Sequence, residues 1–200
     1  MMRTTTETEI RAALHAKWLC KLRDSQNALI IDELGLSHAK VRVDIGVING
    51  CVHGFEIKSS ADTLNRLPSQ LDIYSKCLSK LTIVCAPNHT FKVMRNTPEW
   101  CGILEADKGM RGGIHFRSIR RTGTNPHIEL DQLAHLLWRS EARELLSRYD
   151  SVVKVERLSR KQLYAQLASF VTINELVKSI REFMLTRQDW RAPPSTCVMW

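Results

Sequence analysis

The sequence predicts an α/β fold in which helices flank a mixed β-sheet. Three observations support this fold class. Residues 41–58 alternate apolar and polar side chains around an Asn-Gly turn, which is typical of a hairpin. Residues 62–80 carry an apolar stripe at helical spacing, and residues 81–86 form a compact apolar strand. A strand, a helix and a second strand in succession indicate a sheet with helices packed on it.

The other segments extend this pattern toward both ends of the chain. Periodicity and turn residues predict helices over 7–23, 91–98, 129–149, 159–168 and 172–187, strands over 100–105 and 114–119, and a strand or helix end over 28–34. Ser159 with Gln162, and Thr172 with Glu175, are capping-box pairs that open the last two helices.

The length of 200 residues and the hydrophobic content of 44% indicate one large domain, or a core with a helical appendage. We expect a core over 1–128, a helical C-terminal region over 129–192 and a flexible tail over 193–200. An apolar stripe on a helix must be buried. We therefore expect the C-terminal region to pack on the core or, as the second choice, on another subunit of a homodimer.

The register of the hairpin decides whether its charged residues meet. A two-residue turn would place Asp44 and Glu56 on opposite faces of the sheet. A three-residue loop over 49–51 would let them face each other, and Gly50 suits the left-handed position of such a loop. A shared site for the two carboxylates therefore requires the three-residue loop.

Charges inside strands of this composition are costly to bury unless they are paired or bind a metal. Asp44 and Glu56 would supply two ligands for Mg²⁺ (or Mn²⁺), and the Ile57 carbonyl a third oxygen. Lys58, on the same face as Glu56, would activate water and offset charge on a phosphate. The alternative is ordinary ion pairing, of Asp44 with Arg42 and of the others across the strands.

The spacing of Asp44, Glu56-Ile57-Lys58 and the helix over 62–80 resembles the PD-(D/E)XK nuclease superfamily. No proline precedes Asp44, which departs from the family pattern. The stretch 30–86 is also similar to a family of small bacterial and phage nuclease-like proteins, through the segments Asp32-Glu33-Leu34, Arg42-Val43-Asp44, Gly54-Phe55-Glu56-Ile57-Lys58, Asp62-Thr63-Leu64 and Arg66-Leu67-Pro68-Ser69-Gln70. The resemblance implies a restriction-endonuclease-like core with a C-terminal helical appendage.

The same resemblance implies roles for residues outside the hairpin. Glu33, in preference to Glu9, would be an additional catalytic acid and ligand of a second metal, and Gln70 would hold the attacking water or the phosphate. Each also reads as an ordinary exposed side chain. Residues that would contact nucleic acid are Arg42, Arg66, Tyr74, Arg117, Arg120 and Arg121. Tyr74 reads more readily as a packing residue than as a contact, and the last three arginines read equally as a solvated charge cluster.

The composition favours a polyanionic partner. The net charge is +8, and basic side chains neutralise phosphates. No apolar segment has the length of a membrane span, and residues 1–10 do not form a secretory signal. The six cysteines show no Cys-x-x-Cys pair and read as reduced thiols, and the seven histidines show no zinc-binding spacing. These features indicate a cytoplasmic protein with no membrane association.

Together these inferences predict a hydrolase, a Mg²⁺-dependent nuclease or endonuclease that acts on DNA. The alternatives are a non-catalytic nucleic-acid-binding or regulatory module on a nuclease fold, and an RNA-directed nuclease. A complete set of Asp44, Glu56 and Lys58 favours catalysis, because a binding module has no need of a metal-binding carboxylate pair.

Overall fold

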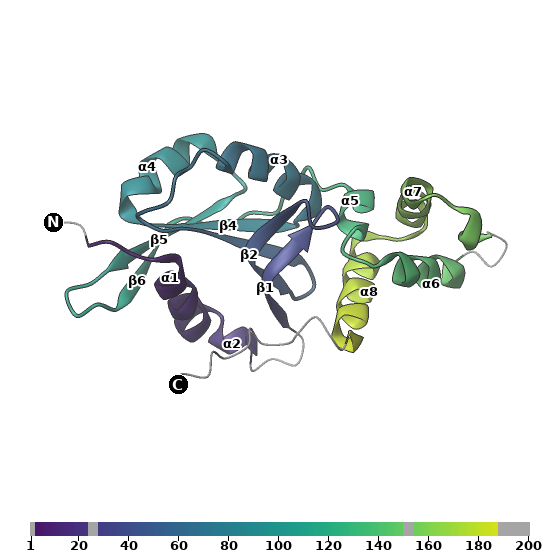
Figure 1. The fold of residues 1–200 in the computed structure, drawn as a ribbon, viewed down its shortest axis with the longest axis horizontal. Helices are drawn as coiled ribbons and strands as arrows, with labels where there is room; N and C mark the ends of the chain where they lie inside the picture. Colours follow the sequence, from purple (N-terminus) through teal and green to yellow (C-terminus); the bar gives the residue numbers. More distant parts are fainter. Residues whose placement is uncertain (1–2, 24–27, 150–153, 188–200) are drawn as a thin grey trace, which may run out of the picture.

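The structure, a computed structural model, describes residues 3–23, 28–149 and 154–187. The tail predicted over 193–200 lies outside this range. The fold is α/β, with a six-stranded mixed sheet and helices on both of its faces (Figure 1). The predicted α/β class, a mixed sheet flanked by helices, is therefore confirmed. None of the described helices is both long and apolar enough to cross a membrane.

The strands follow one another across the sheet in chain order. They are β1 (Leu29–Leu36), β2 (Val41–Ile48), β3 (Val52–Lys58), β4 (Lys80–Cys85), β5 (Gly102–Lys108) and β6 (Ile114–Arg120). Strands β1, β2 and β3 are antiparallel, β3, β4 and β5 are parallel, and β6 returns antiparallel to β5. Helices join the parallel strands, as parallel pairing requires.

The helices divide between the two faces and one end of the sheet. They are α1 (Glu7–Ala13), the π-helical turn η1 (Leu14–Trp18), α2 (Cys20–Arg23), α3 (Leu67–Cys77), α4 (Pro87–Asn96), α5 (Leu130–Ala134), α6 (Arg139–Tyr149), the 3₁₀ turn η2 (Val155–Arg157), α7 (Arg160–Phe170) and α8 (Ile173–Thr186). In Figure 1, α3 and α4 lie on one face, α1 on the other, and the green and yellow helices α5–α8 beside the sheet.

Local sequence signals determine where α1, α3, α7 and α8 begin. Thr6, Ser159 and Thr172 each cap a helix through a reciprocal capping box, which confirms the two boxes predicted near the C-terminus. Helix α3 starts at Leu67 with Pro68 in its first turn, where the missing N–H costs nothing.

The single helix predicted over 129–149 is wrong, because the chain forms α5 and α6 with a break between them. At the break the Trp138 amide donates to the Glu141 carboxylate at 2.7 Å, which starts α6 anew. The same carboxylate pairs with Arg187 just beyond α8, and both side chains are about 90% buried or more. The break thus ties α6 to the end of α8.

The apolar stripe of α8 is buried inside the single chain. Leu176, Ile180 and Met184 belong to the same apolar cluster as Leu133 of α5 and Leu71 of α3. A second, smaller cluster fills the space between α1 and the opposite face of the sheet. The C-terminal helices are therefore continuous with the larger core through α5 and α3.

Candidate functional site

The β2–β3 hairpin brings Asp44 and Glu56 to facing positions. Ile48 pairs with Val52 across a three-residue loop, and the same register continued along the strands sets Asp44 opposite Glu56. Gly50 adopts the left-handed conformation, with φ of 63°. The predicted three-residue loop is confirmed, and its reason is the glycine at the one position of the loop that needs a positive φ.

Glu56 is a buried carboxylate, 2% exposed, whose oxygens accept hydrogen bonds from three side chains. Lys58 Nζ and Gln70 Nε2 donate to Oε1 at 2.8 and 2.7 Å. The Tyr74 hydroxyl donates to Oε2 at 2.6 Å. Burial, followed by the Glu56 charge, raises the pKa of Tyr74 well above its usual value, so the hydroxyl keeps its proton. Glu56 and Lys58 therefore form a buried ion pair with its hydrogen bonds completed inside the protein.

Asp44 has a different environment on the neighbouring strand. Its Oδ2 accepts a hydrogen bond from the Ile57 amide at 2.5 Å. Burial raises the pKa of Asp44 to about 7, and the negative charge of Glu56 adds to this. The Ile57 hydrogen bond and the positive charge of Arg11 act in the opposite direction. The protonated form of Asp44 is thus favoured over a wider pH range than is usual for an aspartate.

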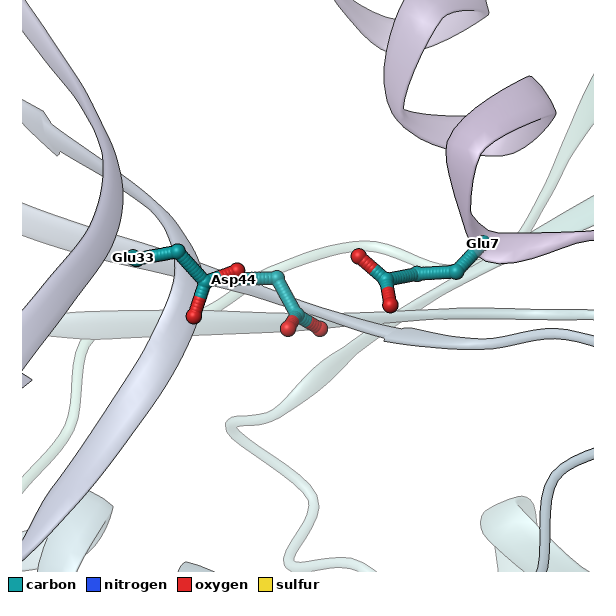
Figure 2. A group of neighbouring side chains, drawn as sticks. All are labelled: Glu7, Glu33 and Asp44. Carbon is teal, nitrogen blue, oxygen red and sulfur yellow. The ribbon is translucent and has the colours of Figure 1, made fainter. Parts of the chain in front are cut away.

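Arg11 of α1 inserts its guanidinium among three acids from three elements. Its Nη2 lies 2.5 Å from Glu7 Oε1, 2.5 Å from Glu33 Oε1 and 3.6 Å from Asp44 Oδ1. Its Nη1 donates to the backbone oxygen of Asp44 at 2.7 Å. Figure 2 shows Glu33 beside Asp44, with Glu7 pointing toward them from α1. One oxygen of each acid lies within 4.8 Å of the others.

A divalent cation does not fit between Asp44 and Glu56 in this arrangement. A cation needs several oxygen ligands that point at one position with lone pairs available to it. Both oxygens of Glu56 accept hydrogen bonds from side chains, and Oδ2 of Asp44 accepts one from the Ile57 amide. The acids that do gather near Asp44 share the Arg11 cation instead. The expectation of Mg²⁺ or Mn²⁺ stays a prediction, and no chemical step is derived from it.

The predicted catalytic and metal-binding residues thus fall into two adjoining groups. Glu56, Lys58 and Gln70 form one closed network together with Tyr74. Asp44, Ile57 and Glu33 form the other around Arg11.

The residues predicted to contact nucleic acid are scattered over the molecule. Arg42, Arg66 and Arg121 are exposed, on β2, at the start of α3 and after β6. Arg117 pairs with Glu105 at 2.7 Å, and the Arg120 guanidinium donates to the Cys101 carbonyl at 2.7 Å. Tyr74 is fully buried, and its hydroxyl is used inside the protein.

Glu7 and Arg11 belong to the site, but the sequence did not single them out. They lie four residues apart on α1, which is the spacing of an intrahelical ion pair. That spacing is the one local signal for them. Only the docking of α1 on the sheet shows that Arg11 also reaches Glu33 and Asp44. Glu9, the competitor of Glu33 for the extra acidic role, pairs instead with Lys108.

The comparison with known proteins decides the family. The model of the bacteriophage P4 protein cII family matches residues 1–192. The chain belongs to the P4 cII family. It is similar to Protein cII of Enterobacteria phage P4, with 33% identity over 180 residues that make up 90% of this chain. The chain spans 65% of the length of that relative. No solved structure matches the chain.

Membership of the P4 cII family corrects the predicted family and function. The chain is matched by a phage cII family rather than by a nuclease family, so the assignment to the PD-(D/E)XK nucleases was wrong. The predicted Mg²⁺-dependent hydrolase, nuclease or endonuclease was wrong with it. The physical reason is visible in the hairpin: Glu56 and Lys58, read as catalytic groups, neutralise each other in a buried network. A short Glu-x-Lys pattern does not distinguish a catalytic pair from such a structural ion pair.

Proposed function

We propose that this chain is a non-catalytic regulatory module that binds nucleic acid. One observation carries the proposal. The acids that would run hydrolysis are satisfied by the chain's own donors, Glu56 by Lys58, Gln70 and Tyr74, and Glu33 by Arg11. Carboxylates that are already paired inside the protein stabilise the fold and do not take part in hydrolysis. The protein would then act by binding its target. A protein that occupies nucleic acid without cutting it regulates access to that nucleic acid.

Charge supports nucleic acid as the partner. The chain carries 29 lysine and arginine residues against 21 aspartate and glutamate residues. Such an excess attracts phosphates and releases their counterions on binding. DNA remains the favoured target within this proposal.

A basic junction between the sheet and the C-terminal helices is the proposed docking surface. His38, in the β1–β2 loop, stacks on His135 at a centroid distance of 4.0 Å, and His135 meets the Tyr164 ring at 4.7 Å. Burial lowers the pKa of both histidines, that of His135 to about 4, and the positive charges of Lys40 and Arg160 add to this.

Lys40 and Arg160 therefore lie near the same pair of rings, on the β1–β2 loop and at the start of α7. Both are exposed, and no ion pair involves either of them among the described residues. Asp131 also acts on the His135 ring, and Glu129 lines a cavity with Lys40, but neither acid forms an ion pair with the two cations within the described ranges. Both positive charges therefore remain available to phosphates.

The arrangement of the strands and helices fits this proposal. An antiparallel hairpin followed by parallel strands and helices is the arrangement expected of a restriction-endonuclease-like core, and we propose that the chain uses such a core without catalysis. Because the phage P4 relative is longer than this chain, the activity of the whole relative is not carried over.

The test is the binding of labelled DNA to the purified chain at several salt concentrations. We expect the affinity to fall steeply with salt, with a slope of about one for each phosphate contacted. Lys40→Gln and Arg160→Gln should each weaken binding and lower the slope by about one. Arg111→Gln removes the same charge from an exposed loop far along the chain and should leave the slope unchanged. The absence of any binding to nucleic acid would overturn the proposal.

A further inference from the structure

A small cavity on the α1 side of the sheet combines aromatic, hydroxyl and basic side chains. Its volume is about 170 Å³, and residues that line it include Trp18, His53, Phe55, Thr82, Arg121 and Thr122. They come from the end of η1, from β3 and β4 and from the segment after β6. Ligand pockets for larger molecules usually exceed about 300 Å³. The cavity therefore has room for one ring system rather than for a whole nucleotide.

Flat aromatic side chains form two sides of this cavity. Trp18 is 45% exposed and touches Phe116 edge to face, with ring centroids 6.1 Å apart. Phe55 is buried, and the His53 ring stacks on it at 4.2 Å. Burial lowers the pKa of His53 to about 4, so the ring is neutral at physiological pH. Uncharged flat rings beside an opening are suited to stacking with another aromatic ring.

A chain of hydrogen bonds supplies polar groups at the edge of the cavity. His53 Nε2 lies 2.8 Å from Thr82 Oγ1, and Thr82 Oγ1 lies 2.6 Å from Thr122 Oγ1. A hydroxyl group has one donor and two acceptor positions, so Thr122 keeps capacity for another partner. Gly102 makes this arrangement possible, because a Cβ there would lie 2.0 Å from Thr122 Oγ1.

Basic side chains complete the cavity in two different ways. The Arg120 guanidinium is anchored to Cys101 and Thr97, so the side chain is held in place by the protein. Arg121 is exposed, and its side chain makes no hydrogen bond or ion pair with the other residues that the structure describes. A positive charge beside a stacking site for one ring suits a nucleotide, whose base can stack while its sugar carries a phosphate.

We propose that this cavity accepts an unpaired base of a nucleic acid strand. The base stacks on Trp18, its polar edge meets Thr122, and a neighbouring phosphate meets Arg121. This inference rests on the proposed nucleic-acid binding and narrows it, because an unpaired base requires a single strand or an opened duplex. Stacking on an aromatic ring tolerates any base, so the pocket selects for exposed bases rather than for sequence.

The test compares two single strands of equal length that differ only in their bases. One is oligothymidylate, and the other is an abasic strand with the same phosphates. Binding to the full chain is measured by fluorescence anisotropy at one fixed salt concentration. We expect oligothymidylate to bind about tenfold more tightly than the abasic strand. Trp18→Ala should remove this preference, and Trp18→Phe should keep most of it.

Two further variants test the polar edge of the cavity and control for the loss of an exposed aromatic side chain. Thr122→Val preserves the side-chain shape, removes the hydroxyl and should weaken oligothymidylate binding about fivefold. Phe91→Ala truncates a 63% exposed aromatic on α4, on the opposite face of the sheet, and should change nothing. Equal binding of the two strands by the unaltered protein, or equal effects of Trp18→Ala and Phe91→Ala, would overturn the base pocket while nucleic-acid binding stands. Failure to bind either strand would overturn both proposals.

Discussion

Arg11 donates a hydrogen bond to the backbone oxygen of Asp44 at 2.7 Å, which joins α1 to the second strand of the sheet. The same guanidinium lies among the carboxylates of Glu7, Glu33 and Asp44. Without a cation at that position, the three acids would repel one another. The site is therefore built around a cation that the chain itself supplies, and α1 is held on the sheet by charge as well as by its apolar face.

Removal of this cation should destabilise the fold. Arg11→Met keeps much of the apolar volume and leaves the three acids without their shared partner. We expect a loss of about 2 kcal/mol in the free energy of unfolding at pH 7, measured by urea denaturation. Lys76→Met breaks an exposed helical pair with Asp72 and should cost less than about 0.5 kcal/mol. Equal effects of the two substitutions would contradict a central role for Arg11.

The raised pKa of Asp44 predicts that stability depends on pH. Between the ordinary value of 3.8 and the folded value of about 7, the folded state keeps a proton that the unfolded state has lost. The contribution of this group to stability therefore falls as the pH rises through that range, and its full cost is reached above about pH 7.

Asp44→Asn should remove that cost, because the amide is neutral at every pH and its oxygen still accepts from Ile57. We expect the variant to be more stable than the unaltered protein at pH 8, by on the order of 2 kcal/mol, with the difference shrinking toward pH 4. Thermal melting at a series of pH values measures this. A variant that is less stable at pH 8 would show that the ionised Asp44 is favoured by the fold.

Loss of Glu56 should unfold or strongly weaken the protein. Lys58 is 5% exposed, and Glu56→Ala would leave its ammonium group buried without a counter-ion. We expect a loss of about 3 to 5 kcal/mol, whereas a metal-binding acid would be removed with little cost to the fold. Glu144→Ala is the surface control. A melting temperature for Glu56→Ala close to that of the control would argue against a structural ion pair.

The hairpin shows which features can be predicted from sequence. Asn49-Gly50 marks the turn, and Gly50 takes the left-handed position of the three-residue loop. The same pair also suits a two-residue turn, so the sequence narrows the register to two choices. The capping boxes at Ser159 and Thr172 are similarly local. Such signals involve residues within a few positions of one another, so the sequence displays them directly.

The features that were missed depend on contacts between distant residues. The apolar spacing of Leu133 and Leu137 continues across the gap between α5 and α6, and no glycine or proline marks it. The break depends on Glu141, which caps α6 and pairs with Arg187 from 46 residues away. Likewise, nothing near Glu56 in the sequence shows that Gln70 and Tyr74 complete its hydrogen bonds. This is why a structural ion pair was taken for a catalytic one.

The most direct test asks whether the chain binds nucleic acid and leaves it intact. End-labelled single-stranded and double-stranded DNA is incubated with the purified protein in Mg²⁺, in Mn²⁺ and in chelator. Binding is measured first, and the same samples are then run on a denaturing gel. The account predicts salt-sensitive binding in all three conditions, with every strand recovered at full length. Strand cleavage that requires the metal and stops with chelator would contradict it.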